Sequence, residues 1–518
     1  MDFLKDISPR DYQKQIFETC KNANCLVVLP TGLGKTLISL MLTIHRMQEF
    51  PGDKVLFLAP TKPLAEQQMN AFQKQLPELF GSLELFTGEV NAEKRKKIWK
   101  SADIIFSTPQ CIANDLRKNL YNLEEVCLLI EDEAHRCIKN YDYNFIAQKY
   151  KSQSAHPRII GLTASPGSEK EKVQQICRNL SIEKLEVRTR EDTEVKKYLQ
   201  ELEFEKQFVD FPPAFQDIKH AITKLLNSYI EELKVRGVLY GIANKGTIIK
   251  LQKEISAAIS RGNKNFNYFL AASACGQTLK LQHSLELLET QTLSGFNKYL
   301  KELFDQASKK QSKGVVKLVA QPEFNFAYML SNELLSKNQE HPKLQKLIEL
   351  VEKENINKKS KIIVFTQFRN TASEIVKIIN SKTPYKAIVF VGQAKKNGTG
   401  LTQKDQKRII EEFSRGEVDI LVATSIGEEG LDIPEVNAVI FYEPIPSAIR
   451  KIQRAGRTAR LMQGKLIILI TRDTRDESNY YISRSREKKM YKTIGEIKDD
   501  LDNIQEKINE VKEVQKTL

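Results

Sequence analysis

The chain has 518 residues, a length too great for a single hydrophobic core and one that indicates several domains. Its composition, 41% hydrophobic and 28% charged residues, excludes an intrinsically disordered chain, and no run approaches the roughly 20 apolar residues that cross a bilayer. The formal net charge of +14 is typical of proteins that neutralise phosphates, although a basic, solvated surface is a common alternative.

The cysteines and the amino terminus bear on the cellular compartment. Seven cysteines, an odd number without metal-ligand spacing, predict reduced packing thiols rather than a disulfide framework or a zinc site. The stretch 1–6 has no charged leader followed by a long apolar run. We therefore expect a cytoplasmic protein with no membrane partner.

From residue 25 to about 190, short apolar runs alternate with helix-period segments. The hydrophobicity within each run is continuous rather than alternating, which is what strands buried on both faces require. We therefore predict a doubly wound parallel sheet in a first α/β domain at 1–190. The runs that predict its strands are 25–29, 54–59, 83–87, 103–107, 126–130 and 158–162.

Between residues 195 and 335 the strand signal disappears and long helix-period stretches dominate. This change predicts an all-α domain inserted before a second α/β domain at 336–478, where the first pattern returns. The later runs are 361–365, 387–391, 420–423, 439–441 and 465–470. The insertion carries basic residues that either contact a nucleic-acid backbone or form an ordinary solvated face, namely Lys245, Lys250, Lys253, Arg261 and Lys264.

The segment 479–518 is predicted to be a charged helix with a narrow apolar seam. Its apolar residues recur at alternating three- and four-residue spacing, at Ile494, Ile497, Leu501, Ile504, Ile508 and Val511. We expect this seam to dock on the chain's own second domain, with a dimerising coiled coil as the alternative. The oligomeric state therefore stays open.

A phosphate-binding loop is predicted at residues 30–36, between an apolar strand and a helical run. Its glycines let the backbone approach phosphate oxygens, and the helix amino terminus supplies N–H groups without helical partners. Lys35 would pair the β- and γ-phosphates of ATP, and the Thr36 hydroxyl would ligate Mg²⁺. Leu29 replaces the first glycine of the strict pattern. The loop residues assigned to ATP are Thr31, Gly32, Gly34, Lys35 and Thr36.

Acidic residues at 131–135 (Glu-Asp-Glu-Ala-His) follow the predicted strand 126–130 directly. At this edge of a sheet Asp132 can hold Mg²⁺, and Glu133 can orient and deprotonate the attacking water. A surface acidic cluster is the alternative. Carboxylates that end a buried strand beside a phosphate loop favour phosphoryl transfer with ATP and Mg²⁺ as cofactors.

A third element, Gln-Arg-Ala-Gly-Arg-Thr-Ala-Arg at 453–460, lies in the second α/β domain. Arg457 and Arg460 are three residues apart, so they share one helix face and can reach one cleft. Opposite the phosphate loop they would act as arginine fingers on the γ-phosphate, and Gln453 is assigned to the same catalytic group. Fingers on a different domain would couple hydrolysis to closure of the cleft.

In order and spacing these motifs resemble superfamily 2 helicases with a DEAH-type second motif, which have two RecA-like domains. The resemblance implies adenine recognition by Arg10 and Gln13, nucleotide contacts by Gly430 and Asp432, and linkage of hydrolysis to movement through His135, Thr163 and Ser165. It also implies sequence-independent nucleic-acid contacts, at Pro60, Thr61, Thr87, Gly88, Thr108, Gln367, Gln393 and Thr424.

A closer resemblance is to the archaeal Hef helicase and its eukaryotic FANCM relatives. It is carried by the stretches 390–394, 400–403, 428–432 and 441–450 and by the helical insertion. The resemblance implies a thumb-like, DNA-binding insertion and 3′ to 5′ movement on single-stranded, forked or branched DNA, in repair or fork restart. We find no Glu-Arg-Lys stretch followed by a metal-binding Asp, so DNA cleavage is not expected and a separate nuclease or repair partner is conceivable.

Two other activities stay open. RIG-I-like and Dicer-type helicases also carry helical insertions at this place, so RNA or double-stranded RNA is an alternative substrate. A non-catalytic clamp that only binds ATP is the other alternative. The complete set of predicted phosphoryl-transfer residues disfavours a clamp, because a retired motor would be expected to have lost at least one of them.

Overall fold

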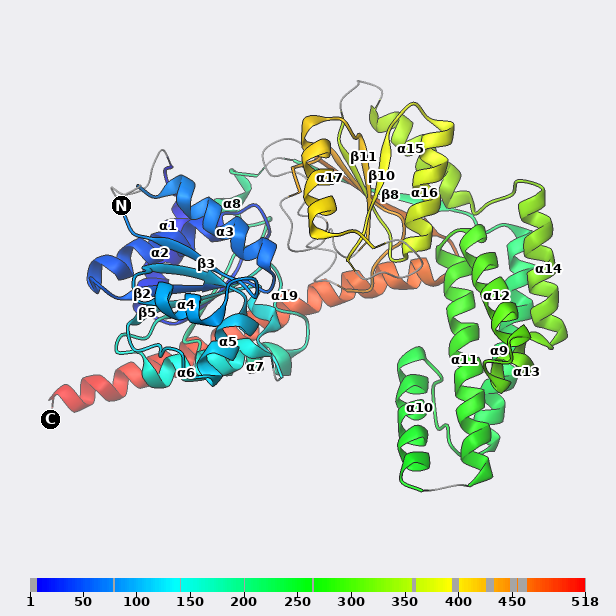
Figure 1. Ribbon diagram of the computed structural model, residues 1–518, viewed down its shortest axis with the longest axis horizontal. Coiled ribbons are helices and arrows are strands. Elements are labelled where there is room, and N and C mark those ends of the chain that lie inside the picture. Colours follow the sequence, from blue (N-terminus) through cyan, green and yellow to red (C-terminus); the bar gives the residue numbers. More distant parts are fainter. Residues whose placement is uncertain are drawn as a thin grey trace.

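A computed structural model describes residues 7–77, 80–139, 141–199, 201–262, 265–355, 360–393, 400–424, 433–447, 454 and 464–517, with side chains of the last helix up to Glu506. Within these ranges the chain forms two parallel sheets, each covered by helices, and one all-helical bundle (Figure 1). The predicted fold class, two parallel-sheet α/β domains with a helical region between them, is confirmed.

The first sheet has seven parallel strands in the order β3–β4–β2–β5–β6–β1–β7. Most of its strands are buried at every position, which is why their sequences are continuously apolar. The strands are β1 Cys25–Val28, β2 Lys54–Leu58, β3 Leu83–Phe86, β4 Ile104–Ser107, β5 Val126–Asp132, β6 Ile159–Thr163 and β7 Lys184–Val187.

Helices cover both faces of this sheet, and each face has its own apolar core. One core takes Ile16, Ile38 and Phe72, from α1, α2 and α3, and the other includes Ile112 and Ile146, from α5 and α6. The helices are α1 Asp11–Asn22, α2 Lys35–Glu49, α3 Lys62–Gln75, α4 Ala92–Trp99, α5 Pro109–Arg117, α6 Asp142–Gln153, α7 Lys170–Asn179 and the short α8 Thr193–Lys196.

The second sheet has six parallel strands in the order β10–β11–β9–β12–β13–β8, covered by α15 Pro342–Asn355, α16 Arg369–Lys382 and α17 Gln403–Arg415. One strand corrects the sequence analysis, because β8 lies inside the stretch predicted to be helical and without strands. As an edge strand it pairs only with β13 and is partly exposed, so it carries no continuous apolar run. The strands are β8 Leu202–Val209, β9 Ile362–Phe365, β10 Ala387–Phe390, β11 Ile420–Ala423, β12 Ala438–Phe441 and β13 Gly464–Thr471.

The helical bundle lies beside the second sheet and has a separate apolar core (Figure 1). Its helices are α9 Pro213–Val235, α10 Lys245–Ser260, α11 Phe266–Thr290, α12 Leu293–Ser308, α13 Lys313–Val319 and α14 Pro322–Ser336. All seven cysteines are buried and free of disulfides. Across the described ranges, no helix is both long enough and apolar enough to traverse a bilayer.

The last helix, α19 Arg475–Thr517, corrects a second expectation. It leaves β13 of the second domain, but its residues Met490, Ile494 and Ile497 are buried in the core of the first domain, where the helix packs on β7 and α7 (Figure 1). Docking of the seam on the second domain was therefore wrong. The 43-residue helix is about 65 Å long, enough to leave the second domain and cross the first. The seam residues Ile494, Ile497 and Leu501 therefore pack within the chain rather than on a coiled-coil partner, whereas Ile504 is exposed.

Candidate nucleotide site and nucleic-acid face

The order of strands sorts the predicted motifs into two groups at one edge of the first sheet. Parallel strands all end at the same edge, so the loops that follow them lie side by side. The adjacent strands β5, β6 and β1 precede the acidic residues, the Thr163–Ser165 segment and the phosphate loop. The adjacent strands β3, β4 and β2 precede the predicted nucleic-acid contacts at Thr87, Thr108 and Pro60. Nucleotide and nucleic-acid motifs thus occupy neighbouring halves of one edge.

The phosphate loop has the backbone geometry that its glycines permit. Gly32 and Gly34 adopt φ values of 85° and 79°, in the left-handed region, and Gly34 caps the amino terminus of α2. A β-carbon on Gly34 would be strained at this φ and would also collide with Nε2 of Gln13, so glycine is favoured there. Lys35 and Thr36 open the helix, where N–H groups without helical partners favour an anion.

Gln13 of α1 contacts the phosphate loop itself. Its Nε2 donates to the Leu33 carbonyl at 3.1 Å, and its Oε1 accepts from the Arg10 backbone N–H at 2.9 Å. The hydroxyl of Tyr12 donates to the same carbonyl at 2.9 Å. Arg10 and Gln13 therefore lie beside the nucleotide loop, and their recognition of adenine stays a prediction.

Asp132 and Glu133 end β5 in a constrained geometry. Glu133 has a φ of 51°, a strained value for a residue with a side chain, of a kind that persists at functional sites. Burial raises the pKa of Asp132, and the charge of Glu133 adds to this effect. Burial would also raise the pKa of Glu133, but the adjacent imidazole of His135 and the ammonium of Lys35 outweigh burial and lower it. Glu133 is thus held ionised close to the phosphate-loop lysine.

The side chain of Gln68 lies between Thr36 and Asp132, the two predicted ligands of Mg²⁺. The Thr36 hydroxyl donates to Oε1 of Gln68 at 2.9 Å, and Nε2 of Gln68 donates to a carboxylate oxygen of Asp132 at 3.1 Å. A hydroxyl and a carboxylate are the oxygen donors that Mg²⁺ takes alongside phosphates, so the residues fit this ion. Among the described side chains there is no cluster of three or more His, Cys, Asp or Glu that could hold a metal ion.

His135 stands between the acidic residues and the Thr163–Ser165 segment. Its Nδ1 lies 3.2 Å from a Glu133 carboxylate oxygen and 3.3 Å from the Thr163 hydroxyl. His135 therefore lies within hydrogen-bond distance of Thr163. The Ser165 hydroxyl lies 2.8 Å from the sulfur of Met490 on α19. The part these residues play in coupling stays a prediction.

A buried ion pair holds the nucleic-acid half of the edge. Arg95 bonds both carboxylate oxygens of Asp115, at 2.7 and 2.5 Å, and donates to the Thr87 carbonyl at 3.3 Å. Next to Gly88, the carboxylate of Glu89 pairs with Lys62 at 2.6 Å. Arg95 thus fixes the loop after β3, and the pair of Lys62 with Glu89 links this loop to the start of α3, next to Pro60 and Thr61.

The second sheet arranges its predicted contacts in the same way. Gln367, Gln393 and Thr424 follow the adjacent strands β9, β10 and β11. The backbone N–H of Gln367 donates to the buried Glu443 carboxylate. Gln367 also lines a cavity of about 310 Å³ that Lys245 of the insertion shares, although Lys245 is paired with Glu286 at 2.8 Å.

Five predicted residues lie outside the described ranges, namely Gly430, Asp432, Gln453, Arg457 and Arg460. Within the same motif, Arg454 is described: it is buried, and its guanidinium lies 4.8 Å from the ring centroid of Phe365. Lys264 of the insertion also lies outside the described ranges. The arginine fingers stay predictions.

Sequence reasoning missed three residues that shape the site. Gln68 bridges the metal ligands, the Tyr143 hydroxyl donates to the Asp132 carbonyl at 2.7 Å, and Glu443 holds the backbone of Gln367. Gln68 and Tyr143 lie in no motif, and Glu443 lies in the 441–450 stretch of the Hef resemblance without an assigned role, because each acts through a contact with another element. The strand before Glu443 was predicted, so a carboxylate at its end was the one available hint.

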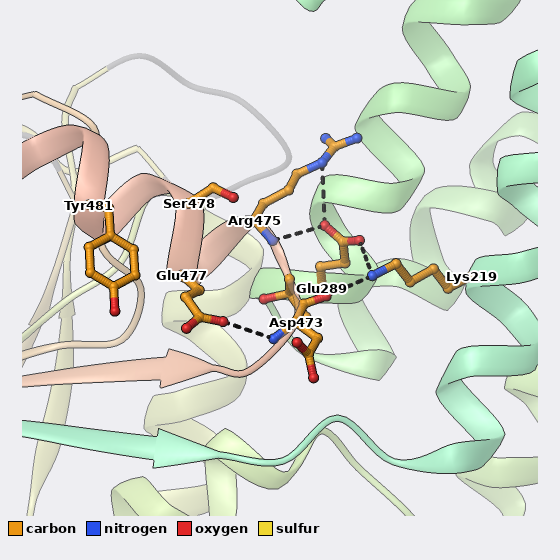
Figure 2. Close-up of a pocket in the computed structure, with 8 residues that line it drawn as sticks. Lys219, Glu289, Asp473, Arg475, Glu477, Ser478 and Tyr481 are labelled. Carbon is orange, nitrogen blue, oxygen red and sulfur yellow. Dashed lines mark hydrogen bonds and ion pairs between the residues drawn. The ribbon is translucent and has the colours of Figure 1, made fainter.

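A cavity of about 500 Å³ at the root of α19 contains none of the predicted site residues (Figure 2). Its lining is paired internally: Glu289 lies 3.0 Å from Lys219 and 3.3 Å from Arg475. These residues come from the bundle and from α19, so the cavity lies in the joint between the bundle and the second sheet.

Comparison with known proteins gives matches along the chain. Three family models match: "DEAD/DEAH box helicase" at residues 10–173, "Putative ATP-dependent RNA helicase, helical bundle" at 214–339 and "Helicase conserved C-terminal domain" at 342–462. The crystal structure of the Pyrococcus furiosus Hef helicase domain matches with a TM-score of 0.71 and 42% identity, over 92% of this chain and 98% of that one.

Two curated relatives differ in the nucleic acid that their names give. A Methanocaldococcus jannaschii protein, which bears the same RNA-helicase name as the bundle model, is 38% identical over 94% of this chain and 60% of its own length. A Schizosaccharomyces pombe ATP-dependent DNA helicase is 32% identical over 94% of this chain and 59% of its own length. The chain therefore spans about three fifths of each relative.

Proposed function

Because the chain belongs to the Hef family of superfamily 2 helicases, we propose that it is an ATP-dependent helicase or translocase that acts on forked or branched DNA. ATP would bind at the phosphate loop, with Mg²⁺ held by Thr36 and Asp132. Bound Mg²⁺ would neutralise charge on the β- and γ-phosphates. Glu133 would orient the attacking water, and Arg457 and Arg460 would stabilise the transferring phosphoryl group from the second domain.

The observation that carries the proposal is the shared edge of the first sheet. The residues predicted to bind nucleotide follow β5, β6 and β1, and the residues predicted to contact nucleic acid follow the neighbouring strands β3, β4 and β2. A motor needs both sites within reach of one rigid element, so that a change at the γ-phosphate alters the grip on a strand. The loops of the second sheet that carry Gln367 and Thr424 supply a second grip in the same way.

DNA is the preferred substrate because the resemblance to Hef implies it and the Schizosaccharomyces pombe relative carries a DNA-helicase name. The Hef domain is also matched over 98% of its length, against 60% for the relative with an RNA-helicase name. We further propose 3′ to 5′ movement, a role in repair or fork restart, and phosphate contacts with little base specificity. Such contacts imply a steep loss of affinity with salt. RNA is the second candidate, because one relative and the bundle model carry an RNA-helicase name.

Assays of ATP hydrolysis and strand separation on a panel of substrates test the proposal. The panel comprises single strands, forks and four-way junctions, each made in DNA and in RNA of the same sequence. We expect forked DNA to stimulate hydrolysis most. Stronger stimulation by the RNA fork would overturn the choice of DNA, and equal hydrolysis on every substrate would overturn the motor.

A further inference from the structure

Gln68, in the middle of α3, joins the two predicted Mg²⁺ ligands. Its Oε1 accepts from the Thr36 hydroxyl at 2.9 Å, and its Nε2 donates to the Asp132 carboxylate at 3.1 Å. The three residues come from α2, α3 and β5, so one amide fixes the relative position of groups on three elements. An amide suits this place because its oxygen accepts from a hydroxyl while its NH₂ group donates to a carboxylate.

The same helix reaches the predicted nucleic-acid face. It begins at Lys62, directly after Pro60 and Thr61, and Lys62 pairs with Glu89 at the loop after β3. The opposite side of α3 lines a cavity of about 760 Å³ whose other wall is α17 of the second domain. That wall includes Gln403 and Lys407. Helix α3 therefore borders the metal ligands, the nucleic-acid loops and the gap between the two motor domains.

We propose that Gln68 is a positioning residue that couples the Mg²⁺ site to nucleic-acid binding, an inference that rests on the proposed function. The side chain orients Thr36 and Asp132 for the ion, as outer-shell partners do for metal ligands. A shift of α3 when a strand binds near Lys62, or when α17 approaches, changes both hydrogen bonds. Binding of nucleic acid and closure of the two domains thereby change the positions of Thr36 and Asp132 through the amide of Gln68.

The test measures metal binding directly, with Mn²⁺ in place of Mg²⁺. Free Mn²⁺ is counted by electron paramagnetic resonance in the presence of the full chain and ADP, with and without forked DNA. In Gln68→Met, which keeps the length of the side chain but removes both hydrogen bonds, we expect the Kd for Mn²⁺ to rise by about 10- to 100-fold. Affinity for ADP in EDTA should stay within about twofold of the wild type, because Gln68 contacts the phosphate loop through the hydroxyl of Thr36, a predicted Mg²⁺ ligand, and not through the backbone N–H groups expected to hold the phosphates.

Coupling gives a second readout. In the wild type, forked DNA should change the Kd for Mn²⁺ by about fivefold or more, and this change should vanish in Gln68→Met. Gln68→Ala serves as a second variant and should behave in the same way. Asn70→Ala removes an exposed amide from the cavity side of the same helix and should match the wild type. Thermal melts of each variant verify folding.

The outcomes separate the inference from the function on which it rests. A Kd for Mn²⁺ in Gln68→Met within about twofold of the wild type would overturn the positioning role. An unchanged response to DNA in Gln68→Met would overturn the coupling. If the wild type shows no DNA-stimulated hydrolysis, the proposed function fails, whereas the Mn²⁺ measurement without DNA still reports on the metal ligands.

Discussion

Replacement of Lys343 by methionine should destabilise the joint between the second sheet and the bundle. Its ammonium is fully buried and donates to Asp476 at 2.6 Å, to the Thr290 carbonyl at 2.7 Å and to the Tyr442 carbonyl at 2.9 Å. Methionine would leave the Asp476 carboxylate buried without its partner, which costs about 3–5 kcal/mol. Each kcal/mol shifts the melting temperature of a domain this size by about 2–4 °C, so we expect a fall of roughly 10 °C.

Differential scanning calorimetry measures this fall in the transition of the second domain. The double variant Lys343→Met with Asp476→Leu should melt above the single variant, because it removes the stranded charge. Lys346→Met is the matched control on the same helix, since its pair with Glu349 is exposed and is worth less than about 1 kcal/mol. A single variant that melts within about 2 °C of the wild type, or a double variant that melts no higher than the single, would refute the reasoning.

Three further predictions concern separate parts of the chain. Gly34→Ala should weaken nucleotide binding, measured by calorimetric titration with ADP, because alanine is strained at a φ of 79° and its β-carbon would displace the Gln13 amide that holds the Leu33 carbonyl of the loop. Gly52→Ala is the control, because Gly52 has a similar left-handed φ but open space around it, and this variant should bind ADP normally. Normal binding of ADP by Gly34→Ala as well would contradict the clash. Ile494→Asp should free α19 from the first domain and expose it to protease, because Ile494 is buried. Ile504→Asp, at a half-exposed position, is the control and should be digested like the wild type. Equal digestion rates of the two variants would contradict the docking of α19. Burial raises the pKa of Glu443 to about 7, above its unfolded value of about 4.5. The folded chain therefore holds this proton more tightly, so wild-type stability should fall relative to Glu443→Gln as pH rises from 5 to 7 and level off above 8, in melts across that range. A difference that is constant with pH would contradict this origin.

Much of the fold is predictable because strands buried on both faces carry a simple pattern. Strands β1, β2 and β5 each contain a continuous apolar run, and each leads toward a loop whose polar residues stand out. Strand β8 was missed for the opposite reason. Its Phe204 and Phe208 are partly exposed at a sheet edge, and the charged residues between them read as part of a helical region.

The candidate site divides in the same way. Lys35, Asp132 and Glu133 are predictable because phosphate chemistry demands these residue types at the ends of adjacent strands. The bridge through Gln68 was not predictable, since it depends on α3 lying beside α2 so that Gln68 reaches both Thr36 and Asp132. The contact of Met490 with Ser165 likewise depends on the path of α19. An apolar seam predicts that one face of a helix is buried, but it does not predict which surface covers that face.

Nucleic-acid-stimulated ATP hydrolysis by Lys35→Ala tests the central claim most directly. The variant loses the ammonium expected to pair the β- and γ-phosphates. Lys100→Ala is the control, because it removes an exposed lysine outside the phosphate loop. Hydrolysis is measured with saturating forked DNA. We expect the wild type and Lys100→Ala to be stimulated alike, and Lys35→Ala to lose at least about 100-fold of the stimulated rate. Stimulated hydrolysis that is unchanged in Lys35→Ala would contradict an ATP-driven motor built on this loop.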